Sequence, residues 1–145
     1  MALILVVDDE PAVRRLLVRW LSAEGHETME AGDADAALEV MGKQPAAVVF
    51  CDVQMPGHDG LWLMRELRER FPHVAIVLAT GAATVPPAVS MRAGVLAYLV
   101  KPFSQPVVLQ SLDTALKWHD AALVSGPHRE DSADRVQAWL DSLEP

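Results

Sequence analysis

The chain has 145 residues, 51% of them hydrophobic, which is enough for one compact domain with a buried core. Its 20 Asp and Glu outnumber its 12 Lys and Arg, and the net charge of −8 argues against direct binding to nucleic acid or to an acidic membrane surface. The single cysteine, Cys51, excludes an internal disulfide, and no apolar run approaches the roughly 20 residues of a membrane helix, so we expect a cytoplasmic protein.

Five stretches of the sequence predict β-strands. Four of them are six-residue apolar runs without polar alternation, as is typical of strands buried on both faces: 2–7, 46–51, 74–79 and 95–100. The first run lacks a basic flank and continues directly into an acidic triplet, which does not match a signal peptide. The more polar stretch at residues 27–31 would suit a strand at the edge of a sheet.

Helical patterns lie between these strands, with apolar residues repeated at i, i+3 and i+4. They cover residues 13–21, 34–41, 63–71 and 108–116, and a shorter, poorly patterned helix begins near residues 86–87. Pro11 opens the first of these helices and Gly25 follows it, as is usual at helix ends.

Strand and helix therefore alternate five times within residues 1–123. Short loops between them favour parallel strands joined by right-handed crossovers, so we predict an α/β, doubly wound domain over residues 1–123. Residues 124–145 begin with a Ser-Gly-Pro turn signal and then carry four apolar residues at helical spacing: Val136, Trp139, Leu140 and Leu143. We interpret them as a linker and a short amphipathic helix, either a connector to an output domain or a tail that packs on its own domain.

Polar residues follow four of the predicted strands: Asp8-Asp9, Asp52, Thr80 and Lys101. The carboxyl ends of parallel strands share one edge of the sheet, where ligands bind. Any one of these residues could simply cap a helix, but four such coincidences indicate a site. Carboxylates about 4 Å apart repel by about 4 kcal/mol per pair at an effective dielectric near 20, so a cation is expected. Lys101 supplies one charge, and hard oxygen ligands also suit Mg²⁺.

A carboxylate at such a site can act as a nucleophile toward a phosphoryl group. The metal ion and Lys101 would neutralise charge on the transferred oxygens, and the hydroxyl of Thr80 could bond to one of them. The chemistry would then depend on positioning and electrostatics.

Four motifs at these positions make the chain, from about residue 3 to 123, resemble the receiver domain of bacterial two-component response regulators. They are VVDDEP at 6–11, DVQMPGHDG at 52–60, ATG at 79–81 and YLVKPF at 98–103. The resemblance implies a flavodoxin-like sheet of order 2-1-3-4-5 with five helices. It also implies that Asp52 accepts a phosphoryl group from the phosphohistidine of a sensor histidine kinase or a phosphotransfer protein.

The same resemblance assigns roles around Asp52. Asp9 resembles a direct metal ligand, Asp8 a ligand that acts mainly through water, and Gln54 the donor of a backbone carbonyl to the metal ion. Thr80 and Lys101 match the hydroxyl and the ammonium that bind the phosphoryl group.

The resemblance also implies a conformational change that links the phosphorylation site to a partner-binding surface. Tyr98 matches an aromatic residue that changes rotamer, and the peptide bond before Pro102 is expected to be cis. The surface that changes would be the fourth helix, fifth strand and fifth helix. A homodimer partner or an effector could dock there on Val85, Val89, Tyr98 and Val107.

Two other classes of protein share parts of this pattern. A phosphohydrolase of the haloacid dehalogenase type usually has a second carboxylate two residues after its nucleophile, where this chain has Gln54. A flavin- or nucleotide-binding module would need a glycine-rich loop after the first strand, where this chain has Asp8-Asp9-Glu10. We therefore expect a signalling domain that promotes its own aspartyl phosphorylation and dephosphorylation, and not an enzyme.

Overall fold

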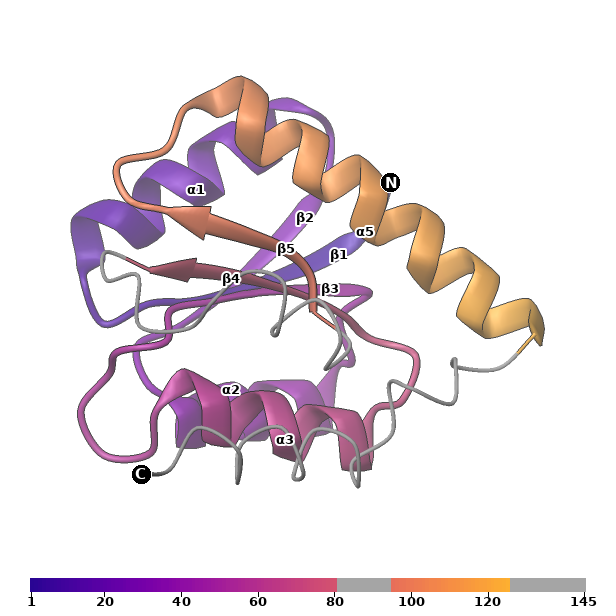
Figure 1. Ribbon diagram of the computed structural model, residues 1–145, viewed down its shortest axis with the longest axis horizontal. Coiled ribbons are helices and arrows are strands. Elements are labelled where there is room, and N and C mark those ends of the chain that lie inside the picture. Colours follow the sequence, from indigo (N-terminus) through magenta and orange to yellow (C-terminus); the bar gives the residue numbers. More distant parts are fainter. Residues whose placement is uncertain (81–94, 126–145) are drawn as a thin grey trace.

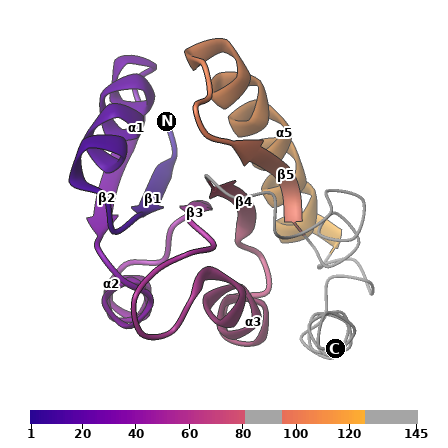
Figure 2. The same cartoon turned by 60° about the vertical axis from the view of Figure 1, so that its left-hand side comes forward.

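A parallel five-stranded sheet lies between two layers of helices in the computed structural model, which describes residues 1–80 and 95–125 (Figure 1). The strands are β1 (Leu3–Val7), β2 (Glu27–Ala31), β3 (Val48–Cys51), β4 (Ala75–Thr80) and β5 (Val95–Val100). The helices are α1 (Pro11–Ala23), α2 (Ala34–Lys43), α3 (Gly60–Arg70) and α5 (Gln105–Ser125). Figure 2 shows α1 and α5 on one face of the sheet and α2 and α3 on the other.

The strand order is β2-β1-β3-β4-β5 and every neighbouring pair is parallel, which confirms the predicted doubly wound sheet. The polar strand β2 lies at an edge, as expected. Four of the five predicted helices fall within the described residues, whereas the fourth, expected near residues 86–87, falls in 81–94 and lies outside them. Helix α5 continues to Ser125, and the amphipathic segment expected beyond it also lies outside the described residues.

Local sequence signals set the ends of the helices. Pro11 is the first residue of α1, and Gly25 follows that helix with a φ of +88°, a conformation that glycine adopts at little cost. The side chains of Asp33 and Asp59 cap α2 and α3 by accepting hydrogen bonds from the backbone N–H groups of Ala36 and Trp62. The cap at Asp59 orients the loop that connects β3 to α3.

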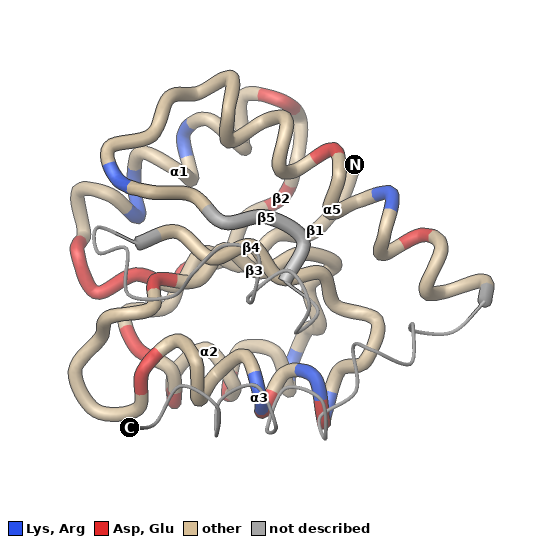
Figure 3. The backbone as a smooth tube through the Cα atoms, in the orientation of Figure 1, with Lys and Arg blue, Asp and Glu red and all other residues tan. Residues whose placement is uncertain are grey.

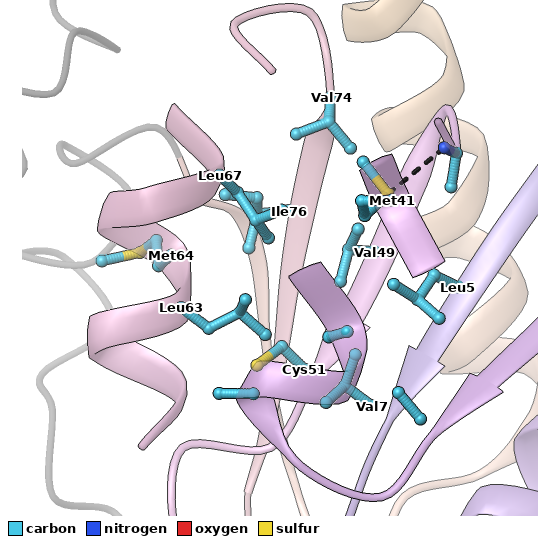
Figure 4. Packing of buried hydrophobic residues seen from close by; sticks show 14 of the residues in the cluster. Leu5, Val7, Met41, Val49, Cys51, Leu63, Met64, Leu67, Val74 and Ile76 are labelled. Atoms are coloured by element: carbon cyan, nitrogen blue, oxygen red, sulfur yellow. Dashed lines mark hydrogen bonds between the residues drawn. The ribbon is translucent and has the colours of Figure 1, made fainter. Parts of the chain in front are cut away.

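Alternate residues of each central strand pack into two separate cores, one on each face of the sheet. Leu5 and Val7 of β1 face α2 and α3, whereas Ile4 and Val6 face α1 and α5. Figure 4 shows the first of these cores. Cys51 is buried in it, and burial together with the charges of Asp52 and Asp8 raises the pKa of its thiol. Both faces of β1 are therefore covered, which explains its uninterrupted apolar sequence.

None of the helices in the described residues is both long enough and apolar enough to cross a membrane.

Candidate functional site

Three strand ends bring Asp8, Asp52 and Lys101 into contact at the carboxyl edge of the sheet. The Nζ atom of Lys101 lies 2.9 Å from Oδ2 of Asp8 and 3.2 Å from Oδ2 of Asp52. In Figure 3, acidic segments of the backbone tube lie at this edge, where β1 ends. The convergence predicted from the order of the strands is confirmed for these three side chains.

Burial makes the electrostatics of this cluster strong. The side chains of Asp8 and Asp52 are 2% and 4% exposed, and that of Lys101 is 13% exposed. Burial and the charge of Asp8 raise the pKa of Asp52, and these effects outweigh the opposing effect of Lys101. Burial alone would lower the pKa of Lys101, but its hydrogen bond to Asp8 and the charges of Asp8 and Asp52 raise it above its ordinary value. Lys101 is therefore a permanent cation at neutral pH.

Backbone amides hold both buried carboxylates in place. Oδ1 of Asp52 accepts a hydrogen bond from the backbone N–H of Gln54 at 3.2 Å, and Oδ1 of Asp8 accepts one from the backbone N–H of Glu10 at 2.9 Å. Each carboxylate thus keeps one oxygen on a backbone amide and turns the other toward Lys101.

The described residues also gather four carboxylates that suit a metal ion. One oxygen from each of Asp8, Asp9, Glu10 and Asp52 lies within 4.8 Å of the others. These are hard oxygen donors of the kind that Mg²⁺ binds through one or two direct carboxylates and several waters. Because the cluster also has solvent-exposed members, Asp9 and Glu10, water can complete the coordination of an ion there.

No role was assigned from the sequence to two residues that the structure places near the cluster, Glu10 and Arg14. Glu10 contributes to the carboxylate group, and its Oε1 lies 3.2 Å from Nζ of Lys101. Arg14 donates from Nη1 to the backbone carbonyl of Asp8 at 2.6 Å and from Nε to Glu30 at 3.0 Å. Glu10 could have been suspected from the acidic triplet, whereas no pattern in the sequence links Arg14 to the turn after β1.

Gly60, the first residue of α3, lies directly against the backbone of Asp52 and Val53. A Cβ atom at this position would overlap the carbonyl oxygen of Asp52 and lie 2.8 Å from Cα of Val53. Its backbone N–H donates to the carbonyl of Val53 at 2.9 Å. The start of α3 therefore packs directly on the backbone that carries Asp52.

Thr80, Tyr98 and Gln54 are only partly placed by the structure. Thr80 ends β4 opposite Val100, and Tyr98 pairs with Leu78, but the side chains of Thr80 and Tyr98 lie outside the described part of the chain. The amide of Gln54 contacts Asp52, and the role expected for its carbonyl stays a prediction. The Lys101–Pro102 peptide bond is cis, as expected.

Sequence comparisons connect the chain to known regulators. A model of the family described as "Response regulator receiver domain" matches residues 4–113. The response regulator protein FleR of Pseudomonas aeruginosa is 40% identical over 109 residues, which are 74% of this chain and 23% of FleR. The transcriptional regulatory protein AruR of the same species is 34% identical over 134 residues, which are 88% of this chain and 54% of AruR. The chain thus spans about a quarter to about half of the length of these relatives.

Solved structures agree with the sequence comparisons. The receiver domain of NtrX from Brucella abortus is 35% identical, with a TM-score of 0.74 over 79% of this chain and 98% of that one. The response regulator protein TrrA from Thermotoga maritima, determined in complex with Mg²⁺-BeF, is 32% identical, with a TM-score of 0.73 over 80% of this chain and 100% of that one. The similarity therefore extends over nearly the whole of both solved chains.

Proposed function

This chain belongs to the response regulator receiver domain family of two-component signalling proteins, and we propose that Asp52 is its phosphoacceptor. The observation that carries the proposal is the contact of Asp52 with Lys101 inside a cluster of carboxylates. The carboxylate would receive a phosphoryl group from the phosphohistidine of a sensor histidine kinase or a phosphotransfer protein. The P–N bond of the donor breaks as the new O–P bond forms on Asp52, and the imidazole keeps the electron pair.

Each neighbouring residue has a part in this transfer. Lys101 would neutralise the charge on the incoming phosphoryl oxygens, because it already lies 3.2 Å from Asp52 and is held charged by its neighbours. The amide of Gln54 fixes one oxygen of Asp52, which leaves the other to form the new bond. Thr80, at the end of β4, would donate its hydroxyl to a phosphoryl oxygen. In this way the chain would promote its own aspartyl phosphorylation and, with water as the attacking group, its dephosphorylation.

A Mg²⁺ ion fits the site and would be held by Asp8, Asp9, Asp52 and the backbone carbonyl of Gln54. The four converging carboxylate oxygens and the Mg²⁺-BeF complex of TrrA support this assignment. When bound, the ion supplies positive charge that stabilises the phosphoryl oxygens during transfer. The ammonium group of Lys101 forms ion pairs with Asp8, Glu10 and Asp52. The Mg²⁺ ion and Lys101 would therefore bind some of the same carboxylates.

An apolar hollow beside the site offers the phosphodonor a place to bind. It has a volume of about 450 Å³ and reaches from α1 to the residues after β5. Val13, Leu16 and Phe103 line it, together with Glu10 and Lys101 of the site itself. We place the kinase or phosphotransfer protein against this hollow, because a donor bound there lies next to Lys101.

Phosphorylation with a small donor tests the proposed function. Incubation with acetyl phosphate and Mg²⁺ is expected to add one phosphoryl group to the wild-type protein, measured as intact mass, and none when EDTA replaces Mg²⁺. Asp52→Asn keeps the shape of the side chain and removes the nucleophile, so it should stay unmodified. Equal labelling of the variant and the wild type would exclude Asp52 as the acceptor.

Substitution of the two aspartates after β1 separates their roles in metal binding. Asp9→Ala is expected to weaken Mg²⁺ binding more than Asp8→Ala, because Asp9 is a solvent-exposed member of the carboxylate cluster, whereas Asp8 already binds Lys101 and the amide of Glu10. A Mg²⁺ titration followed by tryptophan fluorescence or NMR gives both affinities. If Asp9→Ala binds Mg²⁺ as tightly as the wild type, Asp9 is not a ligand.

Phosphorylation should change the surface formed by the fourth helix, fifth strand and fifth helix. We propose that Thr80 moves toward the phosphoryl group and that Tyr98 turns into the space behind it, a population shift between two states. Val107 of α5 is 44% exposed and can contact a homodimer partner or an effector there. Hydrogen exchange of the phosphorylated protein should change most in residues 81–108, and Thr80→Ala should accept phosphate but lose that change. A response confined to residues 124–145 would contradict this proposal.

We also propose how the chain is divided into a domain and a tail. Residues 1–123 would form the receiver domain, and residues 124–145 would form a linker and a short amphipathic helix. The relatives FleR and AruR are longer than the matched region, which supports an output function carried elsewhere. Since histidine kinases phosphorylate their regulators in the cytoplasm, we place this chain there.

A further inference from the structure

A second hollow lies at the opposite edge of the sheet from Asp52, among the amino ends of the strands. Its volume is about 380 Å³, and it is formed by Leu3 of β1, by residues 45–47 and 70–74, and by two residues of α5. The two α5 residues are His119 and Leu123, close to the end of that helix. This end of α5 is at the right of Figure 1, while the strands point to the left. The hollow is thus separate from the phosphorylation site.

The lining of the hollow combines apolar surface with basic groups. Phe71 and Leu123 contribute apolar area, whereas Arg70, His73 and His119 contribute nitrogen atoms, and none of the described residues that line it is acidic. The ring of His119 is held in place by a hydrogen bond between its Nδ1 and the backbone carbonyl of His73. Arg70 is paired through its Nε with Glu66, and its side chain is still 56% exposed. An occupant with apolar side chains and negative charge would complement this lining.

Apolar side chains are also exposed where the described part of α5 ends. Leu123 is 59% exposed and Val124 is 87% exposed, and Leu123 is itself part of the lining. Leu123 therefore extends the apolar lining of the hollow to the exposed end of α5.

The segment that continues from α5 has the matching chemistry. Residues 126–145 contain five acidic and two basic residues, and their apolar members recur at helical spacing: Val136, Trp139, Leu140 and Leu143. Ten residues separate Ser125 from Val136, and an extended chain covers up to about 3.5 Å per residue, so this apolar face can reach back to the hollow.

We propose that residues 136–143 bind in this hollow of the same chain, with their apolar face on Phe71 and Leu123, and that the carboxylate of Glu144, which flanks this face in the helical pattern, lies near Arg70, His73 and His119. A second copy could offer the same segment, but a tether this short gives the chain's own segment an effective concentration in the millimolar range, about the highest a flexible link provides. The proposal is independent of Asp52 phosphorylation, because its residues lie at the other edge of the sheet.

A spin label in the full-length chain tests this contact. Ser142→Cys places the label outside the apolar face, and Cys51 does not compete, because it is buried and its thiol pKa is raised. We expect the label to broaden the NMR amide signals of Ala47, His73 and Leu123, and to leave those near Asp52 sharp. Leu140→Asp in the labelled chain should restore the signals, whereas Ala138→Asp, which adds the same charge on the opposite side of the helical pattern, should not.

Two results would overturn the proposal. The first is a spectrum in which the signals around the hollow stay sharp in the spin-labelled chain while the rest of the domain keeps its wild-type signals. The second comes from a mixture of spin-labelled chain without ¹⁵N and ¹⁵N-labelled chain without the spin label. Broadening in this mixture as strong as in the single labelled chain would make a second copy the occupant.

Discussion

Lys101→Ala is expected to lower the free energy of unfolding of the metal-free protein by about 3 kcal/mol, because it leaves two buried carboxylates without their cation. Asp8 and Asp52 are each less than 5% exposed and both contact Lys101 directly. Urea denaturation in the presence of EDTA measures this loss. Saturating Mg²⁺ should restore much of it, since the ion replaces the missing charge, while labelling with acetyl phosphate stays reduced.

Lys117→Ala is the matched control for this substitution. Lys117 pairs with Asp113 one helical turn away, but the two side chains are 77% and 66% exposed, so the loss should be at most about 0.5 kcal/mol. If both lysine variants are destabilised equally, Lys101 does not neutralise the buried carboxylates. If Lys101→Ala loses metal binding and phosphorylation to the same degree, its main role is to hold the fold.

Asp52→Asn, unlike Lys101→Ala, should raise the free energy of unfolding of the metal-free protein. The raised pKa of Asp52 means that the folded state binds this proton more tightly than the unfolded state. As pH rises from the ordinary carboxyl pKa through the raised value, ionisation of Asp52 therefore costs stability. The metal-free variant should be more stable than the wild type at neutral pH, and the difference should shrink as pH falls through that window. A wild type that is more stable than the variant at pH 7 in EDTA would contradict this reasoning.

Gly60→Ala is the second substitution with a large expected effect. The new Cβ would overlap the backbone of Asp52, and backbone atoms cannot rotate away as a side chain can. We expect a loss of about 1–3 kcal/mol in the free energy of unfolding, together with slower labelling of Asp52, because the overlap is relieved only if β3 or α3 moves.

Gly42→Ala provides the comparison, since both variants add one methyl group to a helical glycine. A Cβ at Gly42 meets nothing within 4 Å, and alanine is the better helix former, so this variant should gain about 0.5–1 kcal/mol. Labelling of Asp52 should be unchanged in it. Two variants with the same stability and the same labelling rate would show that Gly60 has no special contact with the site.

The sequence predicted the parts of this site that depend on the order of the strands. Asp8, Asp52 and Lys101 each follow an apolar run, and parallel strands place such residues at one edge whatever their detailed geometry. The two-sided burial of β1 is similarly visible in its uninterrupted apolar sequence.

The parts that the sequence did not predict depend on how loops and helices approach one another. The contact of Arg14 with the carbonyl of Asp8 needs the angle between α1 and β1, which no periodicity encodes. The closeness of Gly60 to Asp52 likewise follows from the path of the loop between β3 and α3, since a glycine at the start of a helix is also common without such a contact. Glu10 was one of three acidic residues in a row, and only the structure shows that it reaches Lys101.

Mapping the phosphorylated residue tests the central claim most directly. The full-length protein is incubated with acetyl phosphate and Mg²⁺, the acyl phosphate is reduced with borohydride to mark its position, and the peptides are sequenced by mass spectrometry. We predict a single modified residue, Asp52, with Asp8, Asp9 and Glu10 unmodified in the same sample. Modification of any of those three carboxylates in place of Asp52 would contradict the assignment of the phosphoacceptor.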